Sequence, residues 1–312
     1  MPEWLSERGI GEIRYALIDE GAIVEARVEL DDIRRAGSAV AARVVTAAPR
    51  NAVARDEQGV EYLLPRGSGW VTEGAPLTIE ITREAIPGKE PWKRPLGRVT
   101  DKAATEAPTL DARPATANEL GDAGWDDLIE QARTGLVPFA GGELRIEPTA
   151  AMTLIDVDGY GPPDELAVLG AATAAQAIRG LDIGGSIGID LPTTGSKAAR
   201  QRAAEAIDAA LPQPFERTAV NGFGFVQIVR PRQRASLTEL ARDRAPFEAR
   251  VLLRRAEFEP AGAKRLVAHP AVIAAFEARP DWLDALARRL GGTIGLRADA
   301  ALPMSGGYAE QV

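Results

Sequence analysis

The sequence predicts an α+β protein of several domains: a small β-barrel inserted near the N-terminus, then an α/β domain and a small C-terminal α+β domain. Short strand-like runs separated by Gly, Pro and Asp occupy residues 37–84, at the spacing of a small barrel or sandwich. Within residues 151–190, two apolar strands that end in aspartate flank an Ala-rich helical stretch, which is typical of a strand–helix–strand crossover. The 312 residues are enough for two or three compact units.

The composition is that of an ordinary globular protein. Hydrophobic residues make up 45% and charged residues 26% of the chain. No apolar run approaches the ~18–20 residues of a membrane span, and the N-terminus lacks the basic and apolar regions of a signal peptide. We therefore expect a cytoplasmic protein without a membrane partner.

The absence of Cys and the single histidine, His269, limit the chemistry. Disulfides, thiolate zinc sites and a cysteine nucleophile are excluded, and most His-based catalysis is removed. Any catalysis then depends on carboxylates, hydroxyls, Lys or Arg, or a hard metal ion. His269 precedes a proline at a predicted helix start, where a capping or packing role is expected.

The charge is uneven along an acidic chain. The net charge is −8, which argues against an indiscriminate nucleic-acid coat protein. Residues 196–265 nevertheless hold fourteen Lys or Arg against eight Asp or Glu. A local anion-binding face and solvated Arg-rich helices are equally compatible with this excess.

Alternating apolar residues predict a hairpin and then the barrel. Two antiparallel strands, Glu12–Asp19 and Ile23–Leu30, are joined by Glu20-Gly21. A closed five-stranded barrel of the oligonucleotide-binding type fits the next stretch. Its predicted strands are Ala39–Thr46, Asn51–Arg55, Glu61–Pro65 and Leu77–Arg83.

The loop 85–95 carries Lys89 and Trp92, with Lys93 and Arg94 beside them. Cations next to an indole suit a nucleic-acid backbone and a stacked base, although a solvated hairpin tip fits the composition equally well. Residues 101–123, rich in Ala, Thr, Pro, Asp and Glu, are typical of a linker. A short helix, Asp126–Arg133, and a strand, Glu143–Glu147, are expected to follow.

The strand within residues 151–159 places Leu154, Asp156 and Asp158 on one face and buries the alternate residues, because strand side chains alternate with a period of two. A second apolar strand ends at Asp190. The helix Pro163–Arg179 between them predicts a parallel pair with both C-terminal ends at one edge, where open α/β sheets bind ligands. The three aspartates are expected to converge there, in a hard-oxygen site suited to Mg²⁺.

A helix, Lys197–Ala210, and a strand, Phe223–Val229, complete this domain. Arg230, Arg232 and Arg234 follow within five residues, which suits a phosphate clamp; a salt-bridged rim is the alternative. Beyond them we predict a C-terminal cap in which a strand at 249–258 precedes two helices and closing strands. The ranges of those later elements are Pro260–Val267, Ala271–Leu290, Thr293–Ala298 and Tyr308–Val312.

In order and spacing, four stretches resemble the catalytic half of the bacterial ribonuclease E/G family. The resemblance covers most of the chain, but only residues 139–235 carry specific motifs. The hairpin and the barrel ending at Gly88-Lys89 are similar to the family's opening strands and inserted RNA-binding barrel. The four stretches are Gly141-Gly-Glu-Leu-Arg-Ile-Glu-Pro-Thr149, Met152-Thr-Leu-Ile-Asp-Val-Asp-Gly159, Leu181-Asp-Ile-Gly-Gly-Ser-Ile-Gly-Ile-Asp190 and Gly222-Phe-Gly-Phe-Val-Gln-Ile-Val-Arg-Pro-Arg232.

The resemblance implies a nuclease-like α/β domain that cleaves single-stranded RNA with Mg²⁺ held by carboxylates. Asp156 and Asp190 fall on the family's metal-binding aspartates, and Asp158 stands where the family usually has Asn, so it joins the expected catalytic set. RNA contacts are expected at Lys197, Arg230 and Arg232 for phosphates, at Lys89 and Trp92 on the barrel loop, and at Tyr62 and Trp70 as loosely matched barrel aromatics.

Two further departures indicate a reduced, divergent member. The family's zinc link between protomers needs cysteines that this chain lacks, so a homo-oligomer, if formed, is not zinc-linked. The stretch that normally binds the RNA 5′ phosphate is largely replaced by the linker. The expected parts are N-terminal strands packing on the catalytic part (1–36), the barrel (37–97), the linker (98–123), the catalytic α/β domain (124–235) and the C-terminal domain (236–312).

Three functional hypotheses follow. The first is a Mg²⁺-dependent endoribonuclease acting in RNA processing or decay. The second is a non-catalytic RNA-binding or regulatory relative that has kept the fold. The third treats the carboxylates as a structural metal or salt-bridge site in an enzyme with an unrelated substrate.

Overall fold

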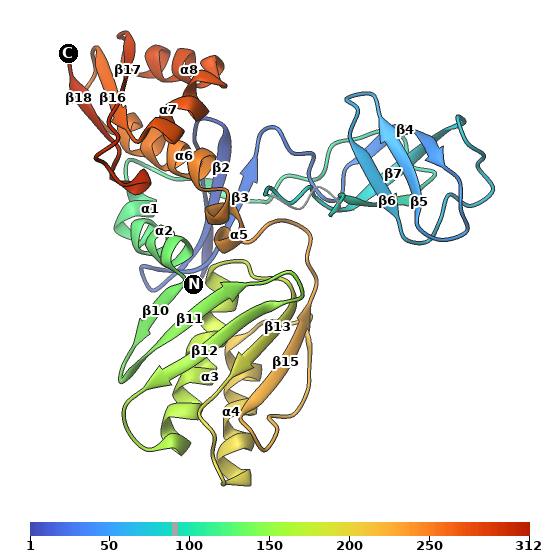
Figure 1. The fold of residues 1–312 in the computed structure, drawn as a ribbon, viewed down its shortest axis with the longest axis vertical. Helices are drawn as coiled ribbons and strands as arrows, with labels where there is room; N and C mark the ends of the chain where they lie inside the picture. Colours follow the sequence, from blue (N-terminus) through green and yellow to red (C-terminus); the bar gives the residue numbers. More distant parts are fainter. Residues whose placement is uncertain (89–92) are drawn as a thin grey trace.

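The computed structural model describes residues 1–88 and 93–312 and shows an α+β protein with a closed five-stranded barrel. In Figure 1 the barrel projects to the right, a six-stranded sheet lies at the bottom, and the C-terminal unit lies at the top. The predicted α+β class and the barrel are confirmed. In the described part of the chain, no helix is long and apolar enough to cross a membrane.

The N-terminal sheet has the strand order β3-β2-β1-β9. The predicted hairpin is β2 (Glu12–Asp19) and β3 (Ala22–Leu30), and its turn residues Glu20 and Gly21 both have positive φ, 50° and 83°, as a tight two-residue hairpin turn requires. The sequence analysis did not anticipate the other two strands, β1 (Glu3–Arg8) and β9 (Arg113–Pro114).

The barrel is inserted into this N-terminal sheet, because the chain leaves the sheet after β3 and returns to it as β9. Its strand order is β4-β5-β6-β8-β7, and pairing of β4 with β7 closes it around its own apolar core. Four strands lie where the sequence analysis expects them, and β8, which follows the Pro-rich loop, is additional. The strands are β4 (Ala39–Thr46), β5 (Ala52–Asp56), β6 (Glu61–Leu64), β7 (Pro76–Arg83) and β8 (Leu96–Val99).

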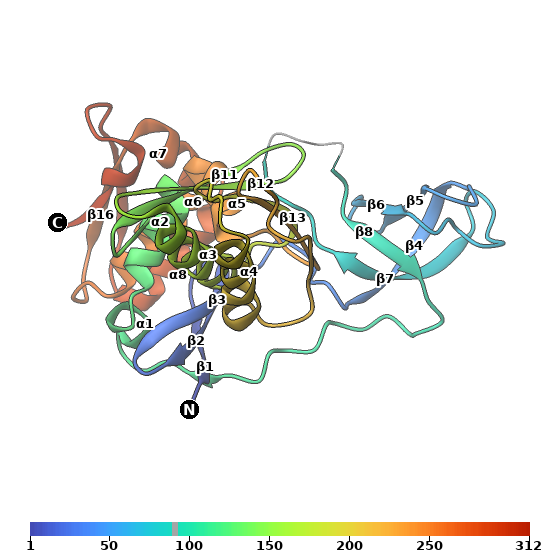
Figure 2. The ribbon, with the colours of Figure 1, turned by 90° about the horizontal axis from the view of Figure 1, so that it is seen from below.

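The segment 98–123 is fixed at several points, which corrects the expectation of a plain linker. Thr105 and Ala39 exchange two backbone hydrogen bonds of 2.8 and 2.9 Å. β9 pairs with β1, and α1 (Glu119–Asp122) buries Leu120 completely. Figure 2 shows the extended path by which this return segment runs from the barrel back to the main body.

The six-stranded sheet has the order β10-β11-β12-β13-β15-β14. β12 and β13 are parallel, as the crossover predicts, and α3 connects them. Figures 1 and 2 both show α3 and α4 on one side of this sheet. The strands are β10 (Leu136–Phe139), β11 (Gly142–Pro148), β12 (Thr153–Gly159), β13 (Gly185–Asp190), β14 (Glu216–Arg217) and β15 (Phe225–Arg230), and the helices are α2 (Trp125–Thr134), α3 (Pro163–Gly180) and α4 (Lys197–Ala210).

The main core lies between this sheet, its helices and the N-terminal sheet. Ile155 and Val157 of β12 are buried against the Ala-rich α3, where Gly170 allows close approach: a Cβ there would lie 2.3 Å from Val157 Cγ1. The core continues into α5 (Leu237–Arg242) and reaches Phe247, so the packing does not stop at residue 235.

The C-terminal unit is an α+β cap, but two of its elements differ from the prediction. Residues 249–258 are mostly helical, within α6 (Arg244–Glu257), because Phe247, Ala249, Leu252, Leu253 and Ala256 are buried at helical spacing. Lys264–Ala268 is a strand, β16, rather than a helix, because it pairs with a strand on each side.

The remaining cap elements lie near their predicted positions. The long helix expected at Ala271–Leu290 is split at Arg279-Pro280, since proline disfavours a helical residue before it. His269 caps the helix after it, as expected: its Nδ1 accepts a hydrogen bond of 3.1 Å from Ala271 N. The elements are α7 (Pro270–Glu277), α8 (Pro280–Leu290), β17 (Ile294–Ala298), η1 (Met304–Gly306) and β18 (Tyr308–Gln311).

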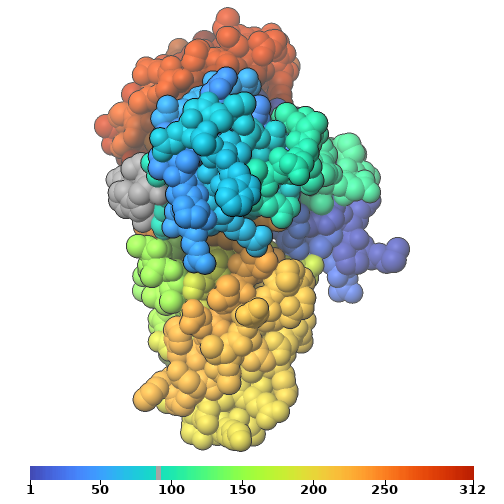
Figure 3. Space-filling model, turned by 90° about the vertical axis from the view of Figure 1, so that its right-hand side faces the viewer, coloured from blue at the N-terminus to red at the C-terminus, as the bar shows by residue number. Residues whose placement is uncertain are grey.

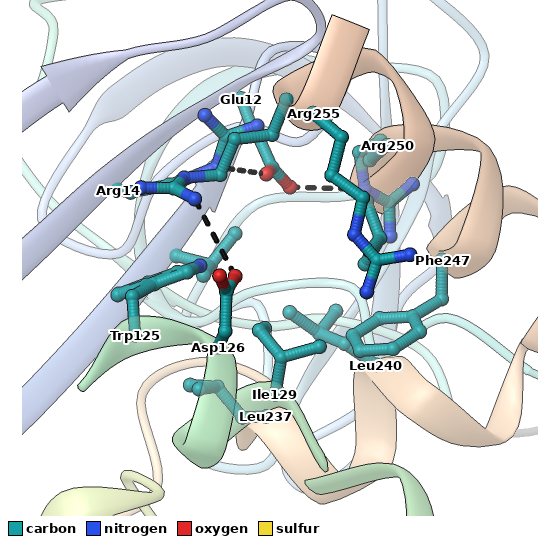
Figure 4. Close-up of a pocket in the computed structure, with 13 residues that line it drawn as sticks. Glu12, Arg14, Trp125, Asp126, Ile129, Leu237, Leu240, Phe247, Arg250 and Arg255 are labelled. Carbon is teal, nitrogen blue, oxygen red and sulfur yellow. Dashed lines mark hydrogen bonds and ion pairs between the residues drawn. The ribbon is translucent and has the colours of Figure 1, made fainter. Parts of the chain in front are cut away.

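A buried ionic network joins the N-terminal sheet to the C-terminal unit. The Arg14 guanidinium, 1% exposed, donates to Glu12 at 2.6 Å and to Glu7 at 2.7 Å. On α6, Arg250 pairs with Glu12 at 3.0 Å and Arg254 with Glu7 at 2.9 Å. Figure 4 shows Glu12 between Arg14 and Arg250, beside a cavity of ≈ 20 Å³, which has room for about one water molecule.

We predict that Arg14→Met destabilises the protein by about 3–5 kcal/mol, because it leaves Glu7 and Glu12 as buried charges with fewer partners. Guanidinium denaturation followed by circular dichroism measures the loss. Arg98→Met is the matched control: Arg98 pairs with Glu80 at 2.9 Å but is 52% exposed, so its loss should stay below about 1 kcal/mol. Equal losses in the two variants would contradict a buried network that joins the units.

Candidate functional site

Asp156 and Asp190 are direct partners across the parallel strands β12 and β13. Neighbouring strands lie about 4.8 Å apart, so the two carboxylates stand side by side. Both are exposed, on the face opposite α3 and α4. We call this face, with Arg145, Leu154, Asp156, Asp158, Asp190, Phe225 and Val229, the exposed sheet face.

The alternation along β12 produces this arrangement. Thr153, Ile155 and Val157 are buried, whereas Leu154, Asp156 and Asp158 are exposed. The predicted division of this strand into two faces is therefore confirmed. Because β12 and β13 are parallel and connected by α3, Asp190 at the end of β13 lies beside Asp156.

The pKa of Asp156 is raised above its ordinary value. Loss of hydration is the largest cause, followed by the negative charges of Asp158 and Asp190. Arg145, the register partner of Asp156 on β11, lowers that pKa. The site therefore concentrates negative charge with one guanidinium facing it, which favours binding of a cation.

Two carboxylates, Asp156 and Asp190, are the candidate metal ligands at this edge of the sheet. Within residues 1–88 and 93–312, no three His, Cys, Asp or Glu side chains are grouped so as to hold a metal ion. Asp158 follows two residues later on the same face, about 6.6 Å along the strand, and its negative charge also acts on Asp156. Mg²⁺ usually binds one or two carboxylates, water and substrate phosphates, so Asp156 and Asp190 fit that ion.

The three arginines expected to clamp phosphates are engaged inside the protein. Arg230 donates to the Ile183 carbonyl at 3.2 Å, Arg232 pairs with Glu239, and Arg234 donates to Asp182 at 3.1 Å. Burial raises the pKa of Asp182, and the charge of Arg234 lowers it. The alternative interpretation of this stretch, a salt-bridged rim, therefore fits Arg230 and Arg232.

Other arginines of residues 196–265 are also paired with carboxylates. Arg217 pairs with Asp208, and Arg250 and Arg254 join the buried network. Lys197 differs, because it is exposed at the first position of α4, seven residues after Asp190 in the chain. Of the phosphate-binding residues expected from the sequence, Lys197 is the one whose placement suits the role.

The barrel residues divide into three cases. Tyr62 is 2% exposed inside the barrel core and its hydroxyl donates to Asp56 at 3.1 Å, so it offers no face to a base, which corrects the expectation. Lys89 and Trp92 lie outside the described residues. Trp70 is fully exposed, on the barrel that stands in front of the main body in Figure 3.

Two features of the exposed sheet face were not given a role by the sequence analysis. Arg145 faces Asp156, and its signal was the alternation of charged and apolar residues along 142–148. The turn before β15 is held by Asn221, whose Oδ1 accepts from the amides of Phe223 and Phe225 at 2.9 and 3.0 Å. The signal there was a Gly-flanked pair of aromatic residues at the start of the predicted strand Phe223–Val229.

Comparison with known proteins adds no relative. No protein-family model and no curated protein matches the chain.

The raised pKa of Asp156, caused first by loss of hydration and then by the neighbouring carboxylates, predicts a measurable cost in stability. The pKa of Asp156 is higher in the folded than in the unfolded protein. The contribution of this group to folding stability is therefore fully present below the unfolded pKa, about 3.9, and is lost as the pH rises through the folded pKa. Asp156→Asn should therefore raise the thermal midpoint at pH 7 by about 1–2 °C in metal-free buffer, and the gain should shrink toward pH 3.5. Asp101→Asn, an exposed aspartate of the return segment, is the control. The same gain at both pH values would contradict the electrostatic cause.

Proposed function

We propose that this protein is a Mg²⁺-dependent endoribonuclease that cleaves single-stranded RNA, as a reduced and divergent relative of the ribonuclease E/G family. The observation that carries the proposal is the in-register pair Asp156 and Asp190 on the exposed sheet face. Two hard carboxylates at the C-terminal end of the parallel pairing of β12 with β13 suit a divalent cation and a phosphate ester.

Asp156 and Asp190 would hold the ion, which when bound supplies a more acidic water and neutralises charge on the phosphate. Loss of hydration raises the pKa of Asp156 most, and the charges of Asp158 and Asp190 add to it; a bound cation would offset that repulsion. Arg145, 57% exposed beside Asp156, is placed to donate to a phosphate oxygen. Lys197 is placed to attract the strand to the same edge.

The barrel supports RNA as the substrate. A closed five-stranded barrel of about 60 residues has the strand number of oligonucleotide-binding folds, and we propose that it is one of them. Trp70, fully exposed on it, offers a ring for base stacking. Because the net charge is −8, RNA would bind along a confined track and not over the whole surface. The affinity for RNA should fall as the salt concentration rises.

The alternative is an RNA-binding relative without catalysis. It is favoured by Asp158 in place of the family's usual Asn, which adds a negative charge two residues beyond Asp156. It is also favoured by the internal contacts of two arginines, because they remove two expected phosphate contacts. Arg230 binds the Ile183 carbonyl and Arg232 binds Glu239. Magnesium titration separates the two functions, because this relative would bind RNA and yield no metal-dependent product.

We predict that Asp156→Asn and Asp190→Asn each bind a short single-stranded RNA within about threefold of the wild-type affinity but cleave it at least 100-fold more slowly, because each removes an ion-holding carboxylate. Gel assays over a Mg²⁺ series measure cleavage, and anisotropy measures binding. Asp208→Asn, a partly exposed carboxylate paired with Arg217, is the control. Wild-type rates in both site variants would refute the assignment.

We further predict equal cleavage rates, within about twofold, for RNA with a 5′ phosphate and with a 5′ hydroxyl. The return segment 98–123 stands where the family's 5′-phosphate-binding stretch is expected, and its anchors are backbone pairing and the buried Leu120. Time courses on the two RNAs in the same buffer test this. A large advantage for the 5′-phosphate form would contradict the loss of the sensor.

A further inference from the structure

Next to the carboxylate pair, the exposed sheet face carries an apolar surface built over a glycine. Gly188 of β13 is the register partner of Leu154 on β12. A Cβ at Gly188 would lie 2.6 Å from Phe225 Cζ and 3.1 Å from Leu154 Cδ2. The Phe225 ring therefore reaches across Gly188 toward Leu154, into space that any other residue at 188 would fill.

This apolar surface adjoins the carboxylates directly. Phe225 is the register partner of Asp190 across β13 and β15, so Asp156, Asp190 and Phe225 form one row across three strands. Phe225 is half-buried and Leu154 is 39% exposed, so both present apolar area to solvent beside a cluster of charge.

The position of Phe225 is fixed by its turn. Asn221 Oδ1 accepts hydrogen bonds from the amides of Phe223 and Phe225, and the Thr193 hydroxyl donates to the Phe223 carbonyl at 3.1 Å. Gly224 adopts φ 92° against the Leu191 carbonyl, where a Cβ would lie at 2.1 Å. The turn is therefore tied to the segment that follows Asp190, and the ring is positioned before any ligand arrives.

We propose that Phe225, backed by Leu154, is the stacking surface for an unpaired base of the nucleotide beside the phosphate at Asp156 and Asp190. The inference rests on the proposed function and adds a residue that decides specificity. An uncharged aromatic ring suits an apolar surface set among carboxylates better than a charged partner does. A base inside a duplex is already stacked on both sides, so this surface selects RNA that is unpaired at that nucleotide.

Steady-state cleavage of a short single-stranded RNA tests the stacking role of Phe225. Phe225→Leu keeps an apolar side chain over Gly188 and should raise KM about tenfold with kcat within twofold, whereas Phe225→Trp should keep KM near wild type. Phe258→Leu, an aromatic residue 46% exposed in the remote C-terminal unit, is the matched control. Thermal midpoints within 2 °C of wild type verify that the folds are intact.

Binding tests the stacking without cleavage. A series of single-stranded RNAs with 2-aminopurine at successive positions is added to Asp156→Asn; fluorescence at one position should be quenched, and Asp156→Asn/Phe225→Leu should lose that quenching. Unchanged KM and quenching in the Leu variants, with an active wild type, would overturn the stacking role alone. An inactive wild type that still shows Phe225-dependent quenching would refute the nuclease but support the surface. A halved mass of Phe225→Leu by light scattering would assign the surface to a contact between copies and overturn the proposal.

Discussion

The parallel pairing of β12 with β13 is the constraint on which the candidate site depends. One face of this pair must be apolar, because α3 and α4 pack on it. The period of two then places every alternate residue on the other face, and the register places Asp156 beside Asp190. A one-residue slip of either strand would bury a carboxylate in the core, so core packing and site geometry are fixed by the same register.

Ionic contacts join the other units of the molecule to one another and to the six-stranded sheet domain. Arg14, Glu7 and Glu12 connect the N-terminal sheet to α6, and Arg234 binds Asp182 close to the end of the barrel, where Glu84 donates its amide to the Gln233 carbonyl at 2.8 Å. Many arginines that resemble an anion-binding set in the sequence thus serve as internal partners of carboxylates.

The sequence predicts best where one local pattern decides the outcome. The strand with Asp156, the helix Pro163–Arg179 and the strand ending at Asp190 were anticipated because periods of two and 3.6 are strong there. The prediction failed at 249–258 and 260–267, where helix and strand are decided by tertiary packing: α6 buries Arg250 and Arg254 against carboxylates from β1 and β2, and β16 is the middle of a sheet. The roles of Arg232 and Tyr62 were also beyond prediction, because Glu239 and Asp56 become their partners only in the folded chain.

The central claim is that Asp156 and Asp190 together bind a divalent cation, and metal binding itself tests it most directly. Manganese, a paramagnetic substitute for magnesium, can be titrated by electron paramagnetic resonance into the wild type, Asp156→Asn, Asp190→Asn and Asp158→Asn in the absence of RNA. The account predicts a bound ion in the wild type and in Asp158→Asn, and at least tenfold weaker binding in each of the other two variants. Equal manganese affinity in all four proteins would contradict it.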